Sequence, residues 1–558
     1  MNSLLLLFLL IITYLLAYNL YGRFLSGRIF ELVKNGDVPS RKLMDGIDYV
    51  PTKKEIIFGH HFTSIAGLGP IVGPAIAIIW GWVPAILWVV FGAIFMGAVH
   101  DFGSLVVSLR NEGKSIGELT GSLITPRARI LFLLIIFFEL WIVIAIFAMI
   151  MGVLFKLYPT SVFPVWMEIP IAVMVGYLAY RKGKNIFWLS ILAIILMYAT
   201  VIIGAYFPLK LPSIEAWLVI LFVYSYIASI LPVWLLLQPR DFINSHELAV
   251  VMFLLFLGVM VAHPSIVAPS CNPSPPGAPS ILPFIFVIIA CGAISGFHSL
   301  VSSGTSSKQV EREEDALFVG YGGMLLESVL SVLVIIAIAA GLGMGYHFKG
   351  RFLTGREAWF AHYSDWVAAS GLGAKLSAFI EGSSNLLAAL QIPRAIAVTI
   401  MGVFIVSFAG TTLDTATRIQ RYVVGEFSGI KNRYLTTLIA VGASALLAFS
   451  QKGGKGALIL WPLFGTVNQL LAGLSLLVIT IYLAYRRKPL YFTGIPMLFM
   501  IGMTGWAMVK NILKFHAEKN MLLFTVGVCI FLLELWMIFE TVLVLRRIKG
   551  GETGGDIS

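Results

Sequence analysis

Apolar runs long enough to cross a membrane follow one another along almost the whole of this 558-residue chain. Because about 20 residues of α-helix span the hydrocarbon layer of a bilayer, the sequence offers about fifteen such runs. Hydrophobic residues make up 59% of the chain and charged residues 12%, a composition that excludes a soluble globular protein. We therefore predict an all-α, polytopic membrane protein with about fifteen transmembrane helices.

The basic loops between these runs predict the topology. The predicted spans lie at residues 3–20, 64–80, 83–108, 129–155, 166–181, 186–206, 215–237, 248–263, 281–302, 317–345, 396–413, 435–450, 457–484, 490–509 and 521–545. If the amino terminus is outside, the most basic loops fall on the cytoplasmic side, as the positive-inside rule requires. We expect a multi-pass protein of the cell membrane, with its amino terminus outside and its carboxyl terminus in the cytoplasm.

Residues 371–390 do not fit this topology, because counting them as a span would move the basic loop at 418–433 outside. Lys375, Glu381 and Asn385 interrupt their leucines and alanines, which is typical of an interfacial or re-entrant helix. We expect a helix of that kind, and the sequence leaves open whether it crosses the membrane.

Glycine and proline break the apolar stretch that follows the first charged loop, GHHFTSIAGLGPIVGP at residues 59–74. Backbone hydrogen bonds lost there cannot be replaced by lipid, so this backbone must face protein or a water-filled cavity. Broken helices at membrane depth expose backbone groups to solutes in transporters. The candidate substrate- or ion-binding positions are therefore Gly67, Gly69, Pro70 and Gly73. The alternative is a hinge needed only for packing.

A second interruption is predicted five spans later, at residues 215–237, where the sequence reads YSYIASILP. The first broken run starts inside and this one starts outside, as expected for an inverted repeat. Two interrupted helices in corresponding positions are the best indication of a transport site in a sequence.

Ionisable side chains also stand inside the predicted spans. His100 and Asp101 lie well inside the span 83–108, and the histidine pair at 60–61 precedes the broken run. A charged side chain at membrane depth is costly unless it is paired, so such residues indicate functional sites. A histidine beside a carboxylate exchanges a proton near neutral pH, which favours His100 and Asp101 as proton carriers. The alternative is a neutral histidine that is hydrogen-bonded to a carbonyl group.

Hydroxyl residues gather around a further histidine in CGAISGFHSLVSSGTSSK, residues 291–308. His298 stands there near Ser302, Ser303 and Thr305. Hydroxyls and freed carbonyls can replace the water of a cation or bind a carboxylate, although small residues equally serve close helix packing.

Threonines and an aspartate stand at the inner end of another span, in FAGTTLDTATRIQRY at residues 408–422. Thr411, Thr412 and Asp414 are candidates for binding substrate or ion. The following Arg418 and Arg421 are also explained as topological anchors.

Glu139 and Glu327 are lone carboxylates inside predicted spans. Either can carry a proton or remain a neutral acid that is hydrogen-bonded to a neighbouring helix. Small residues beside Glu327 favour it, together with His298, as the second proton-coupling candidate. Asn468 adds an uncharged donor and acceptor, which equally suits contact between helices.

Motifs of enzymes, cofactors and metal sites are absent from the sequence. There is no GxSxG, Walker loop or HExxH, and the three cysteines lack CxxC spacing. The net charge of +11 is spread between apolar runs and forms no patch for nucleic acid. The histidine pair at 60–61 with His100 and Asp101 could supply ligands for a transition metal. We nevertheless expect no enzyme activity, no cofactor, no metal and no nucleic acid partner.

Eight stretches resemble, in the same order, the signature sequences of the carbon starvation protein family of bacterial and archaeal transporters. They are DGIDYVPT (45–52), GHHFTSIAGLGPIVGP (59–74), GAVHDF (97–102), LPVWLLLQPRDF (231–242), CGAISGFHSLVSSGT (291–305), GYGGMLLES (320–328), TTLDTATRIQRY (411–422) and LWPLFGTVNQLLA (460–472).

This resemblance implies an inner-membrane secondary carrier related to the five-plus-five inverted-repeat superfamily of amino acid transporters. It also implies uptake of peptides or of pyruvate during carbon limitation, with proton coupling. The chain is shorter than the long members of the family, mainly in its carboxyl-terminal part, so the substrate range does not follow from the resemblance.

We accordingly divide the chain into five parts. They are an amino-terminal transmembrane helix (1–20), a cytoplasmic loop (21–63), an inverted-repeat transporter core (64–413), carboxyl-terminal helices (414–545) and a cytoplasmic tail (546–558).

The predicted function is proton-coupled uptake of peptides across the inner membrane during carbon starvation. A symporter of pyruvate or another small carboxylate is the alternative, and an ion channel or membrane sensor is less favoured. The substrate site is expected near the bilayer midplane, between Gly67–Pro74 and Ser302–Thr305, where helix-end dipoles attract a carboxylate. The coupling ion is H⁺ or Na⁺, and the sequence does not indicate the oligomeric state.

Overall fold

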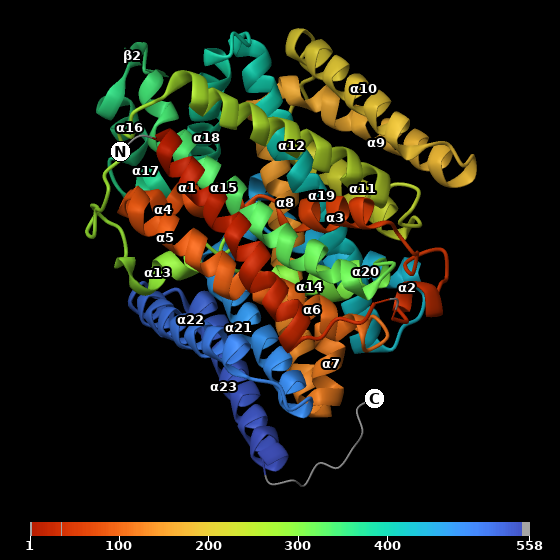
Figure 1. The fold of residues 1–558 in the computed structure, drawn as a ribbon. Helices are drawn as coiled ribbons and strands as arrows, with labels where there is room; N and C mark the ends of the chain where they lie inside the picture. Colours follow the sequence, from red (N-terminus) through yellow and green to blue (C-terminus); the bar gives the residue numbers. More distant parts are fainter. Residues whose placement is uncertain (1–2, 35, 550–558) are drawn as a thin grey trace.

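The computed structural model describes residues 3–34 and 36–549, which form a bundle of helices (Figure 1). The α-helices are α1 (Ser3–Leu16), α2 (Pro39–Lys42), α3 (Lys54–Ile65), α4 (Gly69–Ala77), α5 (Trp82–Gly92), α6 (Ala98–Leu109), α7 (Ile116–Leu123), α8 (Pro126–Leu157), α9 (Val162–Gly176), α10 (Ile186–Tyr206), α11 (Ile214–Ile230), α12 (Leu237–Ala262), α13 (Ile281–Ile288), α14 (Gly296–Gly304), α15 (Gly323–Ala339), α16 (Gly355–Tyr363), α17 (Trp366–Ser370), α18 (Leu372–Ala389), α19 (Arg394–Ser428), α20 (Arg433–Phe449), α21 (Trp461–Tyr485), α22 (Tyr491–Ala517) and α23 (Met521–Lys549).

Short π- and 3₁₀-helical turns extend or join several of these helices. The ones used below are η1 (Ala17–Gly22), η2 (Leu25–Ile29), η3 (Ile78–Trp80), η4 (Ala93–Gly97), η9 (Leu317–Gly322) and η11 (Lys452–Ile459). The strands β1 (Tyr346–Phe348) and β2 (Arg351–Leu353) pair in an antiparallel hairpin.

Among the described residues, 11 helices are long and apolar enough to cross a membrane, or up to 13 if each of two bent pairs counts as one span. The prediction of an all-α, polytopic protein is confirmed, whereas the count of about fifteen spans is not. Two predicted spans account for the difference between the predicted fifteen and the 13 that include the bent pairs. Residues 215–237 contain α11, which has 17 residues, and residues 281–302 contain the short helix α13 and most of the short helix α14.

The amino-terminal boundaries also differ from the prediction. The first helical segment continues through η1 and η2, so it ends at Ile29 and not at residue 20. Leu25, Ile29 and Phe30 are buried, and this apolar face carries the helix past the neighbouring arginines. The predicted loop at 21–63 therefore includes η2, the short α2 and most of α3.

The first broken element consists of α3 and of α4 with η3, which are bent by 42° relative to each other. The chain leaves the helical path after Ile65 because glycines follow, and Pro70, which has no N–H group, stands in the first turn of α4. A Cβ atom on Gly69 would lie 2.2 Å from Sγ of Cys291. Only glycine therefore allows the close approach of the two chain segments at this point.

The second broken element consists of α13 and α14, which are separated by residues 289–295. Gly292 in this gap has a φ of +85°, a left-handed conformation that favours glycine. The prediction of the second break at 215–237 is wrong. There α11 runs unbroken through YSYIASI, and Leu231 and Pro232 begin the turn into α12.

The two broken elements run in opposite directions. From one end of the contact to the other, the neighbouring pairs are His61 with Ser306, Gly69 with Cys291, Gly73 with Ile288 and Trp80 with Pro279. Residue numbers rise along one element while they fall along the other, so the elements are antiparallel.

The helices that follow the two breaks repeat this relation. Where α5–α6 packs against η9–α15, the neighbouring pairs are Val89 with Ser328, Gly97 with Met324 and Phe102 with Gly320. Where α8 packs against α19, the neighbouring pairs are Phe137 with Gln420, Met151 with Gly410 and Tyr158 with Gly402. In addition, α12 packs along α3, and α21 packs along α14. Three segments of the first half thus lie against segments of opposite direction in the second, as expected for an inverted repeat.

The remaining helices lie at the periphery of this core. Figure 1 shows the α9–α10 hairpin at one edge and α22 and α23 at another. The helix at the ambiguous residues 371–390 is α18, which packs against α4, α15 and α19 and is not among the helices that qualify as spans. Its side chains Lys375 and Phe379 are buried within the protein.

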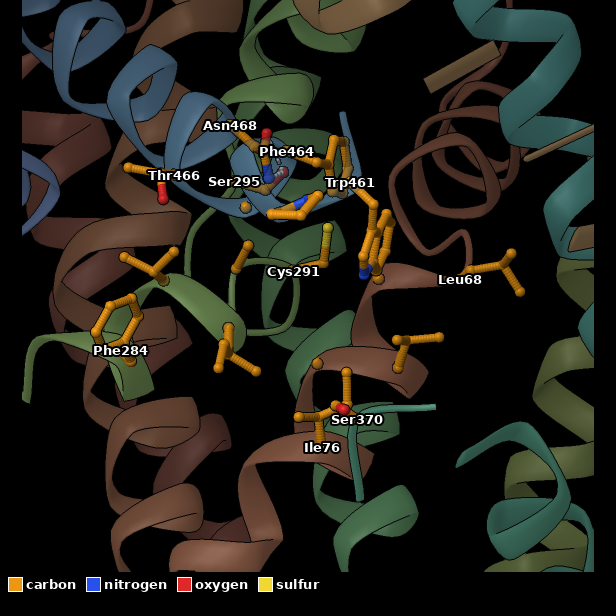
Figure 2. Close-up of a pocket in the computed structure, with 18 of the residues that line it drawn as sticks. Leu68, Ile76, Phe284, Cys291, Ser295, Ser370, Trp461, Phe464, Thr466 and Asn468 are labelled. Atoms are coloured by element: carbon orange, nitrogen blue, oxygen red, sulfur yellow. Dashed lines mark hydrogen bonds between the residues drawn. The ribbon is translucent and has the colours of Figure 1, made fainter. Parts of the chain in front are cut away.

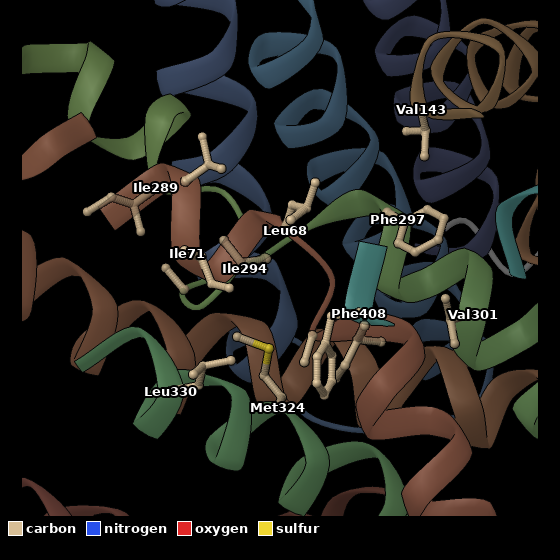
Figure 3. Packing of buried hydrophobic residues seen from close by; sticks show 14 of the residues in the cluster. Leu68, Ile71, Val143, Ile289, Ile294, Phe297, Val301, Met324, Leu330 and Phe408 are labelled. Carbon is tan, nitrogen blue, oxygen red and sulfur yellow. The ribbon is translucent and has the colours of Figure 1, made fainter. Parts of the chain in front are cut away.

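Apolar side chains pack closely around the two breaks. Figure 3 shows Leu68 and Ile71 of the first broken element near Ile294 of the second, with Met324 and Leu330 of α15 beside them. All of these side chains are buried. The polar backbone of the breaks therefore lies in a dry core except where a cavity opens beside it.

Candidate functional site

A cavity of about 690 Å³ lies where the two broken elements meet. Figure 2 shows side chains from both breaks and from the start of α21 around it. The first break contributes Gly67, Leu68, Gly69, Val72, Gly73 and Ile76, and the second contributes Phe284, Val287, Ile288, Ala290, Cys291, Ser295 and Phe297. Backbone freed from helical hydrogen bonding therefore borders a space inside the protein and not the lipid.

The cavity walls are largely aromatic and aliphatic, with a few polar groups among them. The aromatic walls include Phe147, Phe284, Phe297, Trp461 and Phe464. This combination of apolar walls and a few placed polar groups is typical of a site for a small organic molecule.

The polar groups of the cavity come from three helices. Asn468 Oδ1 accepts a hydrogen bond from the Phe297 backbone N–H at 3.0 Å, and Asn468 Nδ2 donates to Ser295 Oγ at 3.0 Å (Figure 2). Thr412 Oγ1 donates to the Ser64 carbonyl at 3.3 Å. These contacts join the first break to α19 and the second break to α21.

Two helix amino termini meet at this cavity. The helix α4 begins at Gly69, and α14 begins at Gly296, directly after the cavity residue Ser295. First-turn amide groups have no partner within their own helix, and the helix dipole gives this end a partial positive charge. The two breaks thus create a place that attracts a carboxylate.

Lysines stand at the open end of the cavity. Lys510 and Lys514 line it together with Pro279, Ser280 and Trp366, and Lys514 is exposed to solvent. Lys510 Nζ donates to Ser280 Oγ at 2.8 Å. Positive charge at a cavity mouth raises the local concentration of anionic solutes.

Four ionisable side chains lie directly behind the second break, and we call them the cavity-side cluster: His100, Asp101, His298 and Glu327. Asp101 Oδ1 is 2.8 Å from His100 Nδ1, and its Oδ2 is 2.9 Å from His298 Nδ1. His298 Nε2 is 3.4 Å from Glu327 Oε2. All four side chains are buried.

The cavity-side cluster is connected to the break itself. Glu327 Oε1 accepts a hydrogen bond from the Gly292 backbone N–H at 3.1 Å. Cys291, which lines the cavity, has its Sγ within 4.8 Å of ligand atoms of both His298 and Glu327. A change of charge in this cluster therefore acts on the backbone that borders the cavity.

Cys291, His298 and Glu327 are also of the types that bind transition metals. Bonds of about 2.0–2.3 Å to one metal ion place tetrahedral ligand atoms roughly 3–4 Å apart. The ligand atoms here all lie within 4.8 Å of one another, and His298 Nε2 is 3.4 Å from Glu327 Oε2. The direct His298–Asp101 hydrogen bond and the His298–Glu327 contact describe the cluster better as a proton-sharing network.

A second ionisable group, which we call the Arg240 node, joins α9, α12 and α19. Arg240 Nε donates to Glu168 Oε1 at 2.7 Å, and its Nη1 pairs with Asp414 Oδ2. Tyr224 OH accepts from Arg240 Nη1 at 2.7 Å and donates to Asp414 Oδ2 at 2.7 Å. This guanidinium group is 3% exposed, so burial makes its pairing with carboxylates necessary.

The Arg240 node continues towards α3 through the next residues of α12. Asp241 Oδ2 is 2.5 Å from His60 Nδ1, and Asn244 Nδ2 donates to Thr411 Oγ1 at 2.9 Å. Asp241 and Asn244 are three residues apart and so share one face of their helix.

The end of the bundle opposite the lysines is closed by the loop at residues 45–52. The Asp48 carboxylate accepts hydrogen bonds from Arg418 Nη1 at 2.7 Å and from Arg421 Nη2 at 2.8 Å. Burial alone raises the pKa of Asp48, but the two guanidinium groups hold it below its usual value. Thr52 of this loop pairs with Val310 in a parallel bridge.

Comparison with known proteins agrees with this architecture. A family model described as carbon starvation protein CstA matches residues 2–507 of the chain. The chain belongs to the carbon starvation protein CstA family. The peptide transporter CstA of Mycobacterium tuberculosis is 33% identical over 91% of this chain and 75% of its own length. The peptide transporter CstA of Bacillus subtilis is 32% identical over 89% of both chains.

A further relative carries a different substrate in its name. The pyruvate/proton symporter BtsT of Escherichia coli is 29% identical over 89% of this chain and 80% of its own length. Among solved structures, a mutant manganese transporter of Eremococcus coleocola superposes with a TM-score of 0.52. It covers 91% of this chain and 99% of its own, at 11% identity, so the likeness shows a shared fold alone. The predictions of this family and of a multi-pass membrane transporter are confirmed.

The CstA-family core places the predicted binding residues in different surroundings. Gly67, Gly69, Gly73 and Thr412 line the cavity, whereas Pro70 does not, and the Pro70 carbonyl accepts from Ser331 Oγ at 3.0 Å. Thr411 and Asp414 belong to the Arg240 node.

The predicted serines and threonine of α14 lie at the far end of that helix and do not line the cavity. Ser303 Oγ accepts from the Ile116 backbone N–H at 3.0 Å, and Thr305 Oγ1 is 3.3 Å from His60 Nε2. Ser302 is buried as well. The cavity therefore extends from the first break towards α21 and not towards Ser302–Thr305.

Four functional candidates were not predicted from the sequence: Glu168, Arg240, Asp241 and Asn244. Arg240 and Asp241 belong to the family motif LPVWLLLQPRDF, where two adjacent charges at the start of an apolar run were the available signal. Glu168 stands alone between tryptophan and proline in VWMEIP and gives a weaker one.

Proposed function

We propose that this protein is a secondary carrier that takes up short peptides across the cytoplasmic membrane, driven by protons. The observation that supports peptides is the size and character of the cavity. Its volume of about 690 Å³ equals that of roughly 20 water molecules, and its walls are mostly apolar. Pyruvate would leave most of that space unfilled, whereas a di- or tripeptide with apolar side chains fills it.

The polar groups of the cavity suit the ends of such a peptide. The helix amino termini at Gly69 and Gly296 favour the peptide carboxylate, and Thr412, Ser295 and Asn468 offer hydrogen bonds close by. Gly67 and Gly73 bring the backbone to the cavity wall without a side chain between it and the substrate.

The cavity-side cluster is the proposed site of the coupling proton. Asp101 accepts from two histidines, and His298 reaches from Asp101 to Glu327, so a proton can be held along this chain at more than one position. Because Glu327 bonds to Gly292 in the second break, loading or release of the proton changes the hydrogen bonding of backbone beside the substrate.

Membrane placement follows the distribution of basic loops. We propose that the lysine-lined mouth faces the outside, that the Asp48 loop faces the cytoplasm, and that the amino terminus is outside. The structure then corresponds to an outward-open carrier, which must open at the Asp48 loop to release its substrate.

Uptake by the purified protein in liposomes tests this function. We expect accumulation of labelled di- and tripeptides under an inwardly directed proton gradient and none when the gradient is collapsed. A sodium gradient at equal pH serves as the control for the driving ion. Downhill flux without accumulation would instead identify a channel.

A symporter of pyruvate or another small carboxylate is the second candidate, supported by the name of the BtsT relative and by the carboxylate-attracting helix ends. Competition distinguishes the two. If peptides carry the function, apolar dipeptides in excess abolish uptake and pyruvate in the same excess does not; the reverse result favours the small carboxylate.

A further inference from the structure

We infer that the cavity selects peptides by charge and that Lys510 of α22 sets this preference. Acidic and neutral peptides are taken up, whereas peptides with a lysine or arginine side chain are rejected. This preference rests on the proposed uptake of peptides and narrows the class of peptide that is carried.

The charged side chains that line the cavity are all positive. Among the described residues around it are two lysines, Lys510 and Lys514, and no aspartate or glutamate. An acidic side chain of a substrate therefore finds a counter-charge in the cavity wall, and a basic side chain finds none. Burial of a charge without a counter-charge is costly, so the cavity favours acidic over basic substrates.

Lys510 is held in place at the cavity. Its Nζ donates to Ser280 Oγ at 2.8 Å, and the Ser280 hydroxyl donates in turn to the Leu282 carbonyl at 2.7 Å. The next residue, Asn511, joins α22 to α21 by donating to Thr466 Oγ1 at 3.0 Å. The described residues form no ion pair with Lys510, so its charge and two of its three N–H groups are available to a substrate.

The acidic residues near the cavity mouth are already engaged elsewhere. Lys514 Nζ is 3.8 Å from Glu518 Oε1, and both side chains are more than half exposed, so water and salt weaken this pair. Asp365 precedes the cavity residue Trp366, but its carboxylate caps α17 by accepting from a first-turn backbone N–H. Lys510 is therefore the charge at the cavity that discriminates among substrates.

The helix ends around the cavity suit the two charges that every peptide backbone carries. The helices α4 and α14 begin there, at Gly69 and Gly296, and α3 and α13 end there, at Ile65 and Ile288. The two kinds of helix end have opposite partial charges, so the amide groups suit the carboxylate and the carbonyl groups suit the α-ammonium group. A further charge on a peptide side chain is then met by Lys510.

Aromatic rings in the cavity are only a partial replacement for a counter-charge. Phe284, Trp461 and Phe464 line the cavity, and a cation is attracted to the face of such a ring. This attraction recovers only part of the cost of removing an ammonium or guanidinium group from water. A basic side chain would also be repelled by Lys510, whereas an uncharged apolar side chain packs against the rings without either cost.

Competition for uptake into liposomes tests this preference. The labelled substrate is the neutral dipeptide dialanine, and the competitors are alanylglutamate, alanylglutamine and alanyllysine, which are similar in size and differ in charge. Under one imposed proton gradient, alanylglutamate should halve the uptake at a concentration at least ten times lower than alanyllysine. Alanylglutamine should lie between them.

Lys510→Glu should invert this order, so that alanyllysine inhibits at a lower concentration than alanylglutamate. Lys510→Gln removes the charge at similar length and should bring alanylglutamate and alanylglutamine to equal potency. Lys452→Glu is the matched control, because Lys452 is an exposed lysine of η11 that does not line the cavity. This variant changes the net charge of the chain by the same amount as Lys510→Glu and should keep the order of the wild type.

The charge preference is overturned if the three competitors inhibit the wild-type protein alike. The assignment of Lys510 is overturned if Lys510→Glu, Lys510→Gln and Lys452→Glu all keep the order of the wild type. Both results would leave peptide uptake itself intact, because the peptides would still compete. Failure of the wild type to accumulate dialanine would instead contradict the proposed function, and the charge preference with it.

Discussion

The cavity-side cluster and the Arg240 node are both buried groups of ionisable residues, but they differ in the permanence of their charge. The cavity-side cluster contains two histidines and two carboxylates, all of which can gain or lose a proton. The Arg240 node is built around a guanidinium group that stays charged at any physiological pH. The first is therefore suited to exchange protons, and the second is suited to hold helices in place.

Their positions in the fold agree with this difference. The cavity-side cluster bonds to Gly292, inside a break, where a small rearrangement alters the cavity. The Arg240 node joins continuous helices through bonds that Arg240 makes to Glu168 and Asp414. The titratable cluster lies beside non-helical backbone, and the permanently charged Arg240 lies between continuous helices.

The largest expected effect comes from Asp101→Asn in the cavity-side cluster. Asparagine carries no charge and can accept from only one of the two histidines, so proton-driven accumulation of substrate should be abolished. The measurement is uptake into liposomes under an imposed pH gradient. Exchange of substrate at equal pH on both sides should persist, since it needs the cavity but no net proton movement. Full accumulation by this variant would remove Asp101 from the coupling mechanism.

Arg240→Met tests whether the Arg240 node holds its helices together. It leaves Glu168 and Asp414 buried without their partner, which typically costs about 3–5 kcal/mol of stability. Thermal unfolding in detergent should show a large decrease in unfolding temperature. Arg41→Met serves as the control, because the Arg41 side chain is 56% exposed where it pairs with Glu311. Equal stability of both variants would show that the Arg240 node does not hold the helices together.

Gly69→Ala examines the point at which the two breaks touch. A Cβ atom there would lie 2.2 Å from Sγ and 2.5 Å from Cβ of Cys291, so we expect a loss of about 3 kcal/mol and a distorted cavity. Gly442→Ala in α20, where nothing lies within 4 Å of the added atom, should instead be neutral or slightly stabilising. Both are measured by thermal unfolding and by substrate affinity. A Gly69→Ala protein with unchanged affinity would place the substrate away from the breaks.

The sequence predicted most of the helices and the first break because both depend on local composition. Apolar runs give helices, and the cluster of glycine and proline at Gly67–Pro74 cannot continue one. The second break lies at residues 289–295, where Gly292 is the only glycine and no proline stands. Proline at position 232 gave a stronger local signal at the wrong place, because it ends α11 and does not interrupt it.

The candidate site was predictable only in part, because its contacts join distant parts of the chain. His100, Asp101, His298 and Glu327 were each recognisable as ionisable residues in apolar runs. That they meet depends on the packing of α6 and α14 against each other and against α15, which one sequence does not reveal. The pairing of Arg240 with Asp414, 174 residues apart, has no local signature at all.

The smallest expected effect concerns the Asp48 loop, which closes the end opposite the cavity mouth. Because Arg418 and Arg421 hold the pKa of Asp48 below its usual value, the stabilisation is present above the pKa of an unfolded aspartate, about 3.9, and is lost as the pH falls through the lower value in the folded protein. Asp48→Asn should therefore cost about 1.5 kcal/mol at neutral pH, the contribution of hydrogen bonds to a charged group.

The measurement is the unfolding temperature of Asp48→Asn and of the wild type across a pH series. The difference between the two unfolding temperatures should shrink towards zero as the pH is lowered to acid values. Neither the cavity-side cluster nor the Arg240 node touches Asp48, so a double variant with Arg240→Met should show additive losses. A pH-independent difference between the two proteins would mean that the loop is held by its backbone bridge to Val310 and not by the carboxylate. In that case the closed end would be a fixed part of the scaffold, and release of substrate to the cytoplasm would need a different path.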